Sequence, residues 1–265
     1  MNNLRRISAV LLLVASAGLA MPRPLAAQPH DMTRFLVPIY IPNAIEGAFG
    51  SIWVSDLRIF NGNPVPVTVL DVHQPCPFDP CTSEVTPIPA RTTAQGSNVH
   101  GSAVRNNPGL LLRTPAETAA NLWFQLYVRD TSCTHFGLGT WLPVVPEDQF
   151  HDGTLHIIGV PAGENYRRML RVYSMDPNAT VATVRTYLDR GLWTRTSPPD
   201  PLLGELTVPL IAGSETQPSY GQIADFASGE GMVRLEIESE ARIWAMVSVT
   251  NNATQEVTAV LPNPL

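Results

Sequence analysis

The sequence contains no lysine, and all 17 of its basic residues are arginines. Only 15% of the residues are charged, and the net charge is −6. No long run of basic residues occurs in the chain. Binding to the phosphate backbone of a nucleic acid depends on clustered lysine and arginine. We therefore expect no nucleic-acid partner.

Motifs of the common catalytic classes are also absent. The chain has no Gly-x-Ser-x-Gly, no His-Glu-x-x-His, no phosphate-binding loop and no dinucleotide fingerprint. Cys133 and His135 would share one face of a strand, but side chains two residues apart in a strand run in parallel and seldom hydrogen-bond. We therefore assign no catalytic residue and predict a protein that is not an enzyme; an enzyme of unrecognised type is the alternative.

Metal ligands do not form a standard pattern. His151 and His156 lack a third ligand at a usual spacing, and no calcium loop of the Asp-x-Asp-x-Asp-Gly type exists. A calcium site at the domain junction is conceivable from Glu147, Asp148 and Asp152. A zinc site is conceivable from His73, Cys76, Cys81 and His100. We predict no metal and no cofactor.

Residues 1–27 have the three parts of a cleavable secretory signal peptide. Arg5 and Arg6 form a positive end, residues 7–20 are almost wholly apolar, and residues 22–27 contain small residues and prolines. The apolar run is shorter than the roughly 20 residues that a spanning helix needs. We expect no membrane span in the mature chain, and cleavage after one of three alanines, Ala27 in preference to Ala20 or Ala17.

Export changes how the remaining residues are interpreted. Residues 28–265 contain 14 arginines and all 23 acidic residues, so their net charge is −9. We expect this mature protein in the periplasm, outside the cell or on the cell surface. Disulfides form in such compartments, so we predict that Cys76 and Cys81, at the ends of a proline-stiffened loop, form a disulfide. A disulfide from Cys133 to either of them, or three reduced thiols, are the alternatives.

Short apolar or alternating segments, separated by turns rich in Gly, Pro and Asn, predict β-strands. They cover residues 35–41, 51–60, 65–70, 109–113, 122–128, 139–145, 154–160, 165–173, 180–188, 205–211, 232–238, 241–250 and 257–261. Only residues 115–121 favour a helix, of one or two turns. The 25 scattered prolines disfavour long helices. The sequence therefore predicts an all-β protein.

The order of these segments repeats after about 113 residues, an offset that aligns Trp53 with Tyr166 and Pro64 with Pro177. Farther on, residues 124–128 align with residues 233–237 at an offset of 109. Each unit has the size and the strand content of an immunoglobulin-like sandwich. We predict two tandem antiparallel β-sandwich domains, residues 28–150 and 151–265, after the signal peptide. Their cores should contain Trp53, Trp123 and Tyr166.

The stretch Gly-Ser-Ile-Trp-Val-Ser-Asp-Leu-Arg-Ile-Phe-Asn, residues 50–61, resembles a signature of uncharacterised exported bacterial proteins with tandem immunoglobulin-like repeats. Their repeats open with a Trp/Phe-x-[ST]-[DN]-Leu-x-[LIV]-x-Asn strand, and residues 243–254 are similar to their last hairpin. The second copy departs from the motif, since Ser174 stands where Asn is expected. The resemblance spans most of residues 35–262. It implies export and a sandwich fold, and no established chemistry.

These features favour a non-catalytic exported structural or interaction protein whose partner is an unknown protein or a glycan. One alternative is a carbohydrate-binding accessory module, in which exposed aromatic rings stack on sugars. Trp141, Trp193 and Tyr220 are the aromatic residues least assigned to a core, so we predict that they face a ligand. A lesser alternative is a periplasmic chaperone-like protein of two sandwich domains. Such chaperones hold a carboxylate with a basic pair that includes a lysine, which this chain lacks.

Overall fold

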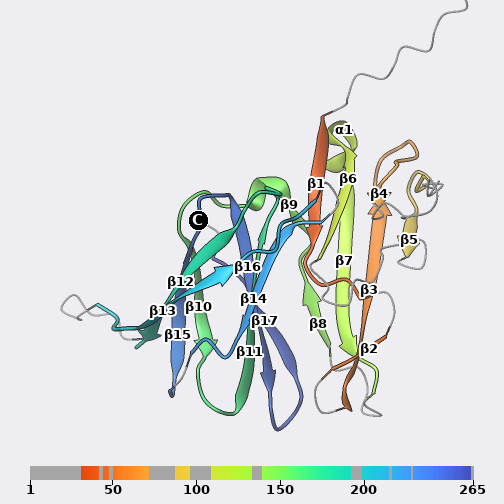
Figure 1. Cartoon of the computed structure of the whole chain (residues 1–265). Helices are drawn as coiled ribbons and strands as arrows, with labels where there is room; N and C mark the ends of the chain where they lie inside the picture. Colours follow the sequence, from red (N-terminus) through yellow and green to blue (C-terminus); the bar gives the residue numbers. More distant parts are fainter. Residues whose placement is uncertain are drawn as a thin grey trace, which may run out of the picture. The chain divides into compact units, whose positions relative to one another are not determined.

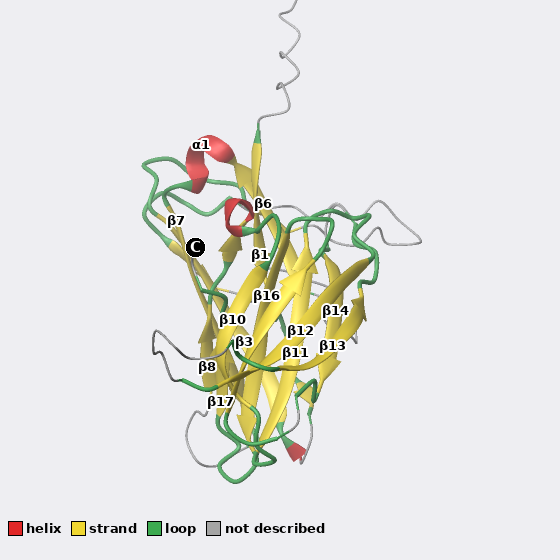
Figure 2. Cartoon of the chain, turned by 90° about the vertical axis from the view of Figure 1, so that its left-hand side faces the viewer, coloured by secondary structure: helices red, strands yellow, loops and turns green. Residues whose placement is uncertain are grey.

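The computed structural model describes residues 31–263, apart from residues 42–43, 48–49, 72–86, 96–108, 133–138, 192–198, 215–216 and 228. Most of this backbone is β-strand, and the longest helical segments are α1 (Ala116–Ala119) and the 3-10 turn η3 (Glu147–Gln149) (Figure 2). The paired strands of the described residues are antiparallel. The prediction of an all-β fold is confirmed.

The N-terminal half contributes two sheets, with strand orders β4-β6-β1-β9 and β2-β3-β7-β8, and β5 pairs with β3 at the edge of the second. Their bounds are β1 Met32–Val37, β2 Ile45–Glu46, β3 Ile52–Asn61, β4 Leu70–Asp71, β5 Thr93–Gln95, β6 Leu110–Pro115, β7 Leu122–Asp130, β8 Gly139–Leu142 and β9 Val145–Pro146.

The C-terminal half contributes two further sheets, with strand orders β10-β15-β12-β13 and β14-β11-β16-β17. We call the second one the middle sheet. The bounds are β10 Leu155–Pro161, β11 Tyr166–Ser174, β12 Val181–Asp189, β13 Leu202–Pro209, β14 Ser219–Ala224, β15 Met232–Glu238, β16 Ile243–Asn251 and β17 Val257–Val260.

The two halves repeat the same strand order. The sequence β4-β6-β1 corresponds to β12-β15-β10, and β5-β3-β7-β8 corresponds to β14-β11-β16-β17. The offset of 113 therefore aligns equivalent strands, β3 and β11. The offset of 109 is wrong, because it aligns β7 with β15, whereas the position of β7 beside β3 is taken by β16 beside β11. The division into two domains at residue 150 stays a prediction.

Two expected segments differ from the structure. Residues 65–69 do not form a strand; only Val67 among them makes an isolated bridge, to Ile88, before the short β4. Pro66 lacks the N–H that a sheet ladder requires, which accounts for the interruption. Conversely, β14 was not expected, because its sequence Ser-Tyr-Gly-Gln-Ile-Ala has no apolar alternation.

Alternation of side chains builds one hydrophobic core in each half. The N-terminal core contains inward residues of β1, β3, β6, β7 and β8, such as Leu36, Leu57 and Leu126, which are fully buried. The C-terminal core contains inward residues of β10, β11, β12, β15 and β16, such as Leu170 and Val184. Fully burying one such side chain stabilises a fold by about 1.5–3 kcal/mol.

The middle sheet is covered on both faces. Leu170 and Val172 of β11 lie in the C-terminal core, whereas Tyr173 of β11, together with Trp244 and Met246 of β16, lies in the N-terminal core. Figure 1 shows the strands of the middle sheet between the β10-β15-β12-β13 sheet and the strands of the N-terminal half. A strand that is buried on both sides needs an uninterrupted apolar sequence. Residues 243–247 of β16, Ile-Trp-Ala-Met-Val, form such an apolar sequence, and all five are buried.

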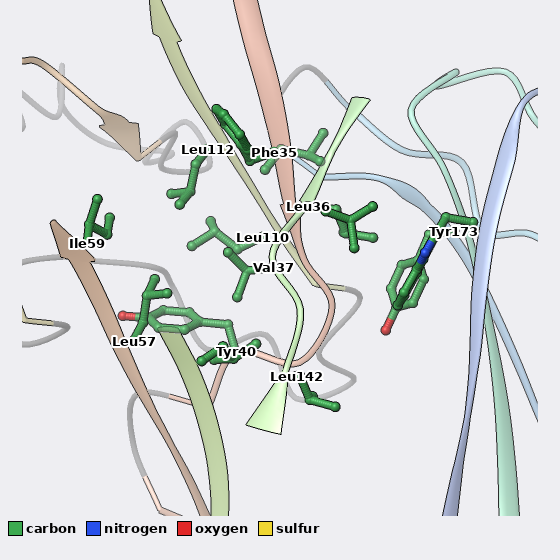
Figure 3. Packing of buried hydrophobic residues seen from close by; sticks show 14 of the residues in the cluster. Phe35, Leu36, Val37, Tyr40, Leu57, Ile59, Leu110, Leu112, Leu142 and Tyr173 are labelled. Carbon is green, nitrogen blue, oxygen red and sulfur yellow. The ribbon is translucent and has the colours of Figure 1, made fainter. Parts of the chain in front are cut away.

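Tyr173 fixes the middle sheet against the N-terminal half. The side chain is fully buried and lies beside Leu36, on the opposite side of β1 from Leu57 and Ile59 of β3 (Figure 3). Its hydroxyl donates a hydrogen bond to the carbonyl of Pro38, just after β1, and its ring centroid lies 5.3 Å from that of Tyr220. Burial raises the pKa of Tyr173, so the hydroxyl stays protonated and can donate this bond.

Arg34 makes a second connection, nearer the start of β1. Its Nε donates to Oε2 of Glu147 at 2.7 Å, its Nη2 pairs with Oε1, and its Nη1 donates to the carbonyl of Met175 at 3.1 Å. One guanidinium thus joins β1, η3 and the segment after β11. The hydrogen bonds from Arg34 hold the pKa of Glu147 below its usual value, although partial burial opposes this shift.

Replacing Tyr173 by Phe removes the bond to Pro38 and leaves a buried carbonyl without its donor. We expect Tyr173→Phe to lower the free energy of unfolding by about 1–3 kcal/mol, measured by urea denaturation. Tyr187→Phe is the control, because that ring lies on β12 outside both cores and its change should stay within about 0.5 kcal/mol. Equal effects of the two variants would contradict the role given to Tyr173.

The Arg34–Glu147 pair predicts a pH dependence of stability. Because the pKa of Glu147 is lower in the folded state, its contribution is complete above the unfolded value of about 4.3 and is lost as the pH falls through the folded value. Glu147→Gln should cost about 1 kcal/mol at pH 7 and should flatten the loss of stability below pH ~4.3. Urea denaturation at several pH values measures both effects. If the variant lost stability below pH ~4.3 as steeply as the wild type, the role given to the Arg34–Glu147 pair would be refuted.

Candidate functional site

The outer side of the β2-β3-β7-β8 sheet carries a group of aromatic side chains. Along β7, Leu122, Leu126 and Val128 are buried, whereas Trp123 and Gln125 are exposed. β3 alternates in the same way. The outward aromatic residues of these strands and of β8 are Phe60, Trp123, Tyr127 and Trp141, which we call the aromatic face.

Three of these side chains are unusually accessible. Trp123 is 68% exposed, Trp141 62% and Phe60 37%. A single exposed apolar residue is normal, but large rings gathered on one sheet face are typical of a binding surface. In the described residues Trp123 and Trp141 are the tryptophans with high exposure, since Trp244 is buried and Trp53 packs against the N-terminal core.

The register of the strands arranges the aromatic face as two pairs of rings. Phe60 lies directly opposite Trp123, and both adjoin Gly62, whose Cβ, if present, would lie 3.6 Å from each ring. Tyr127 lies opposite Trp141, with ring centroids 4.7 Å apart and planes inclined by 37°. Trp123 and Tyr127 are four positions apart on β7, a span of about 13 Å.

Polar side chains fill the space between the two pairs. Arg58 and Gln125 face each other across β3 and β7, and both are exposed. At the second ring pair, Asp56 lies opposite Tyr127 and accepts a hydrogen bond at 2.9 Å from Arg129, one row farther out, with both side chains partly exposed. The face therefore offers apolar rings at two positions and hydrogen-bonding groups between them.

This arrangement suits a ligand with alternating apolar and hydroxyl-bearing surfaces. The face of an aromatic ring is electron-rich and attracts the C–H edges of an apolar partner. The C–H side of a pyranose ring is such a partner, and its hydroxyl groups exchange hydrogen bonds with amide and guanidinium groups. Two ring pairs on an open sheet fit an extended chain better than a single enclosed sugar.

The aromatic residues predicted to face a ligand have different positions. Trp141 is exposed on the aromatic face, and Trp193 lies outside the described residues. Tyr220 is 3% exposed and packs against Tyr173, so the prediction that it faces a ligand on the surface is wrong. It lies on the unexpected strand β14, and its side chain is part of the N-terminal core.

Two of the three predicted core aromatics pack as expected. Trp53 lies against the N-terminal core and Tyr166 against the C-terminal core. The prediction for Trp123 is wrong, because its side chain points to solvent. The alternation Leu122, Phe124, Leu126, Val128 contained the signal, since a residue between inward neighbours must point outward.

The polar candidates do not converge in the part of the chain that the structure describes. Glu147 is held by Arg34, and Asp152 lies 3.6 Å from Arg242. His151 pairs with Ile243 through its backbone, and His156 lies 4.0 Å from Glu236. Among the described residues no three His, Cys, Asp or Glu side chains are placed to hold a metal. The remaining candidates lie outside the described residues: His73, Cys76, Cys81, His100, Cys133 and His135.

Comparison of the chain with protein-family models, curated proteins and solved structures found no match. In the described residues no helix has the length and apolar character to cross a membrane.

Proposed function

We propose that the protein is a non-catalytic, exported binding protein, and that the aromatic face binds an extended glycan. The observation that carries this proposal is the exposure of Trp123 and Trp141 on the same face of one sheet. Exposing two indole rings to water is unfavourable unless a partner covers them. Export is supported by the features of residues 1–27.

The non-catalytic character is supported by the causes of the shifted pKa values of three groups, which are burial and a hydrogen bond within the fold. Burial raises the pKa of Tyr173 and Tyr220, and both hydroxyls lie within the structure and not on the aromatic face. The lowered pKa of Glu147 follows from its hydrogen bonds to Arg34. Each shift has a structural cause, and none of the three groups adjoins the exposed rings.

A glycan is favoured over a protein partner by the groups between the rings. Arg58 and Gln125 present several exposed donors and an amide oxygen in the row between the two ring pairs. A protein interface instead concentrates its apolar residues in a central patch with a polar rim. Here the rings lie at the two ends of the aromatic face, and Arg58 and Gln125 lie in its centre.

The test is isothermal titration of the purified protein with linear β-1,4-linked hexasaccharides of glucose, mannose and N-acetylglucosamine. We expect saturable binding of at least one. Trp123→Ala and Trp141→Ala should each weaken it about tenfold, because each removes one stacking ring. Ile211→Ala is the matched control, since this side chain is 67% exposed but lies outside the aromatic face; its affinity should equal that of the wild type.

Two results would overturn the proposal. One is the absence of binding to all three hexasaccharides. The other is a dimer in sedimentation equilibrium that Trp123→Ala dissociates, since the aromatic face would then be an interface between copies of this chain. Both variants should retain the urea midpoint of the wild type, because the rings that they remove make little contribution to a core.

A further inference from the structure

A second site lies on the other side of the β2-β3-β7-β8 sheet. A cavity of about 360 Å³ separates part of this sheet from the middle sheet. One wall comes from β11, β14, β16 and β17, and the other from β2, β3, β7, β8 and the segment after β1. We call it the inter-sheet groove. Its volume lies in the range of small-molecule sites and holds on the order of a dozen non-hydrogen atoms at ~30 Å³ each.

The walls of the inter-sheet groove are mainly apolar. They include Ile41, Trp53, Leu142, Met169 and Met246. The indole N–H of Trp53 already donates to Oγ of Ser51 at 2.9 Å, so the ring offers the groove its apolar surface. Methionine side chains adapt to ligands of irregular shape. An apolar chain or ring system is therefore the natural occupant of most of this volume.

The row of residues around Met169 explains why space remains between the sheets. Ala224, Ser248 and Ala259 are aligned with Met169 across the middle sheet, and all four line the groove. Three small side chains in one row fill less of the space between the sheets than larger ones would. In the Tyr173 row of the same sheet, by contrast, large rings fill the N-terminal core.

Two arginines bracket this row on the groove side. Arg167 and Arg171 lie two residues before and after Met169 on β11, each about 7 Å away along the strand. They share its face with Tyr173, whereas Arg168 lies on the opposite face with Leu170. There Arg168 donates to the carbonyl of Pro161 at 3.2 Å and lies 3.9 Å from Asp225.

Both groove-facing guanidinium groups donate hydrogen bonds to neighbouring side chains. Arg171 donates to Oγ of Ser248 at 2.8 Å, and Arg167 donates to Oε1 of Gln255 at 2.9 Å. In the described residues Arg171 makes no ion pair with a carboxylate. Arg168 and Asp225 lie together at the edge of the groove, so the positive charges on the groove side are those of Arg167 and Arg171, in a chain of net charge −6.

A partly buried cation beside apolar walls is costly unless an anion joins it. A guanidinium has five donors in a planar fork, and its best partner is a carboxylate that accepts two of them. Arg171 donates to Ser248 and also hydrogen-bonds the hydroxyl of Tyr220, and the remaining donors of its fork are left for a ligand. The charge and the apolar walls together specify one kind of molecule.

We propose that the inter-sheet groove binds an amphiphilic carboxylate, with the head group at Arg171 and the apolar part along Met169, Met246 and Trp53. This site is separate from the aromatic face, and its occupancy does not depend on glycan binding.

The test is isothermal titration of the full-length protein with decanoate below its critical micelle concentration, with 1-decanol as the uncharged comparison. We expect saturable decanoate binding with one site, and weaker binding of 1-decanol. Arg171→Gln should weaken decanoate binding about 10- to 100-fold, because a charge-assisted hydrogen-bond pair is lost. Arg167→Gln should act in the same direction, which keeps the test decisive if one variant fails to fold.

Two further variants separate the groove from the rest of the surface. Ala224→Trp places a large ring in the groove from the exposed end of β14 and should abolish decanoate binding. Arg58→Gln and Trp123→Ala alter the aromatic face alone and should leave it unchanged. The proposal is overturned if decanoate does not bind, if 1-decanol binds equally well, or if both groove arginine variants bind like the wild type.

Discussion

The structure depends on a sheet that is buried on both faces. The middle sheet supplies Leu170 and Val172 to one core and Tyr173, Trp244 and Met246 to the other. No polar face remains for most of β16, so the position of both halves follows from one continuous set of apolar contacts. The hydrogen bond from Tyr173 to Pro38 and the Arg34–Glu147 pair add direction to contacts that are otherwise non-directional.

Two surfaces of the β2-β3-β7-β8 sheet do not take part in this packing. The β2-β3-β7-β8 sheet contributes only its inner side to a core, so the rings on its outer side do not serve packing. Where the two sheets separate, small residues and arginines replace the large rings that fill the interface elsewhere. The aromatic face and the inter-sheet groove are thus the two sides of one sheet, and each departs from what packing alone requires.

The strand positions were largely predictable from the sequence, because alternation and turn residues are local signals. Long-range pairing was not: the offset of 109 aligned β7 with β15, since apolar alternation alone does not identify the neighbour of a strand. β14 escaped prediction because Ser219–Ala224 lacks alternation, and with it the burial of Tyr220. Trp123 could have been placed outward from the parity of its neighbours. The groove required the structure, because its two walls come from distant segments.

The most direct test of the central claim is to observe the indole N–H signals of the five tryptophans by NMR during titration with a hexasaccharide that binds. The account predicts that the signals of Trp123 and Trp141, assigned by single substitution, shift with saturation, while those of the packed Trp53 and Trp244 stay in place. Shifts confined to Trp53 or Trp244, or no shift at Trp123 and Trp141, would contradict it.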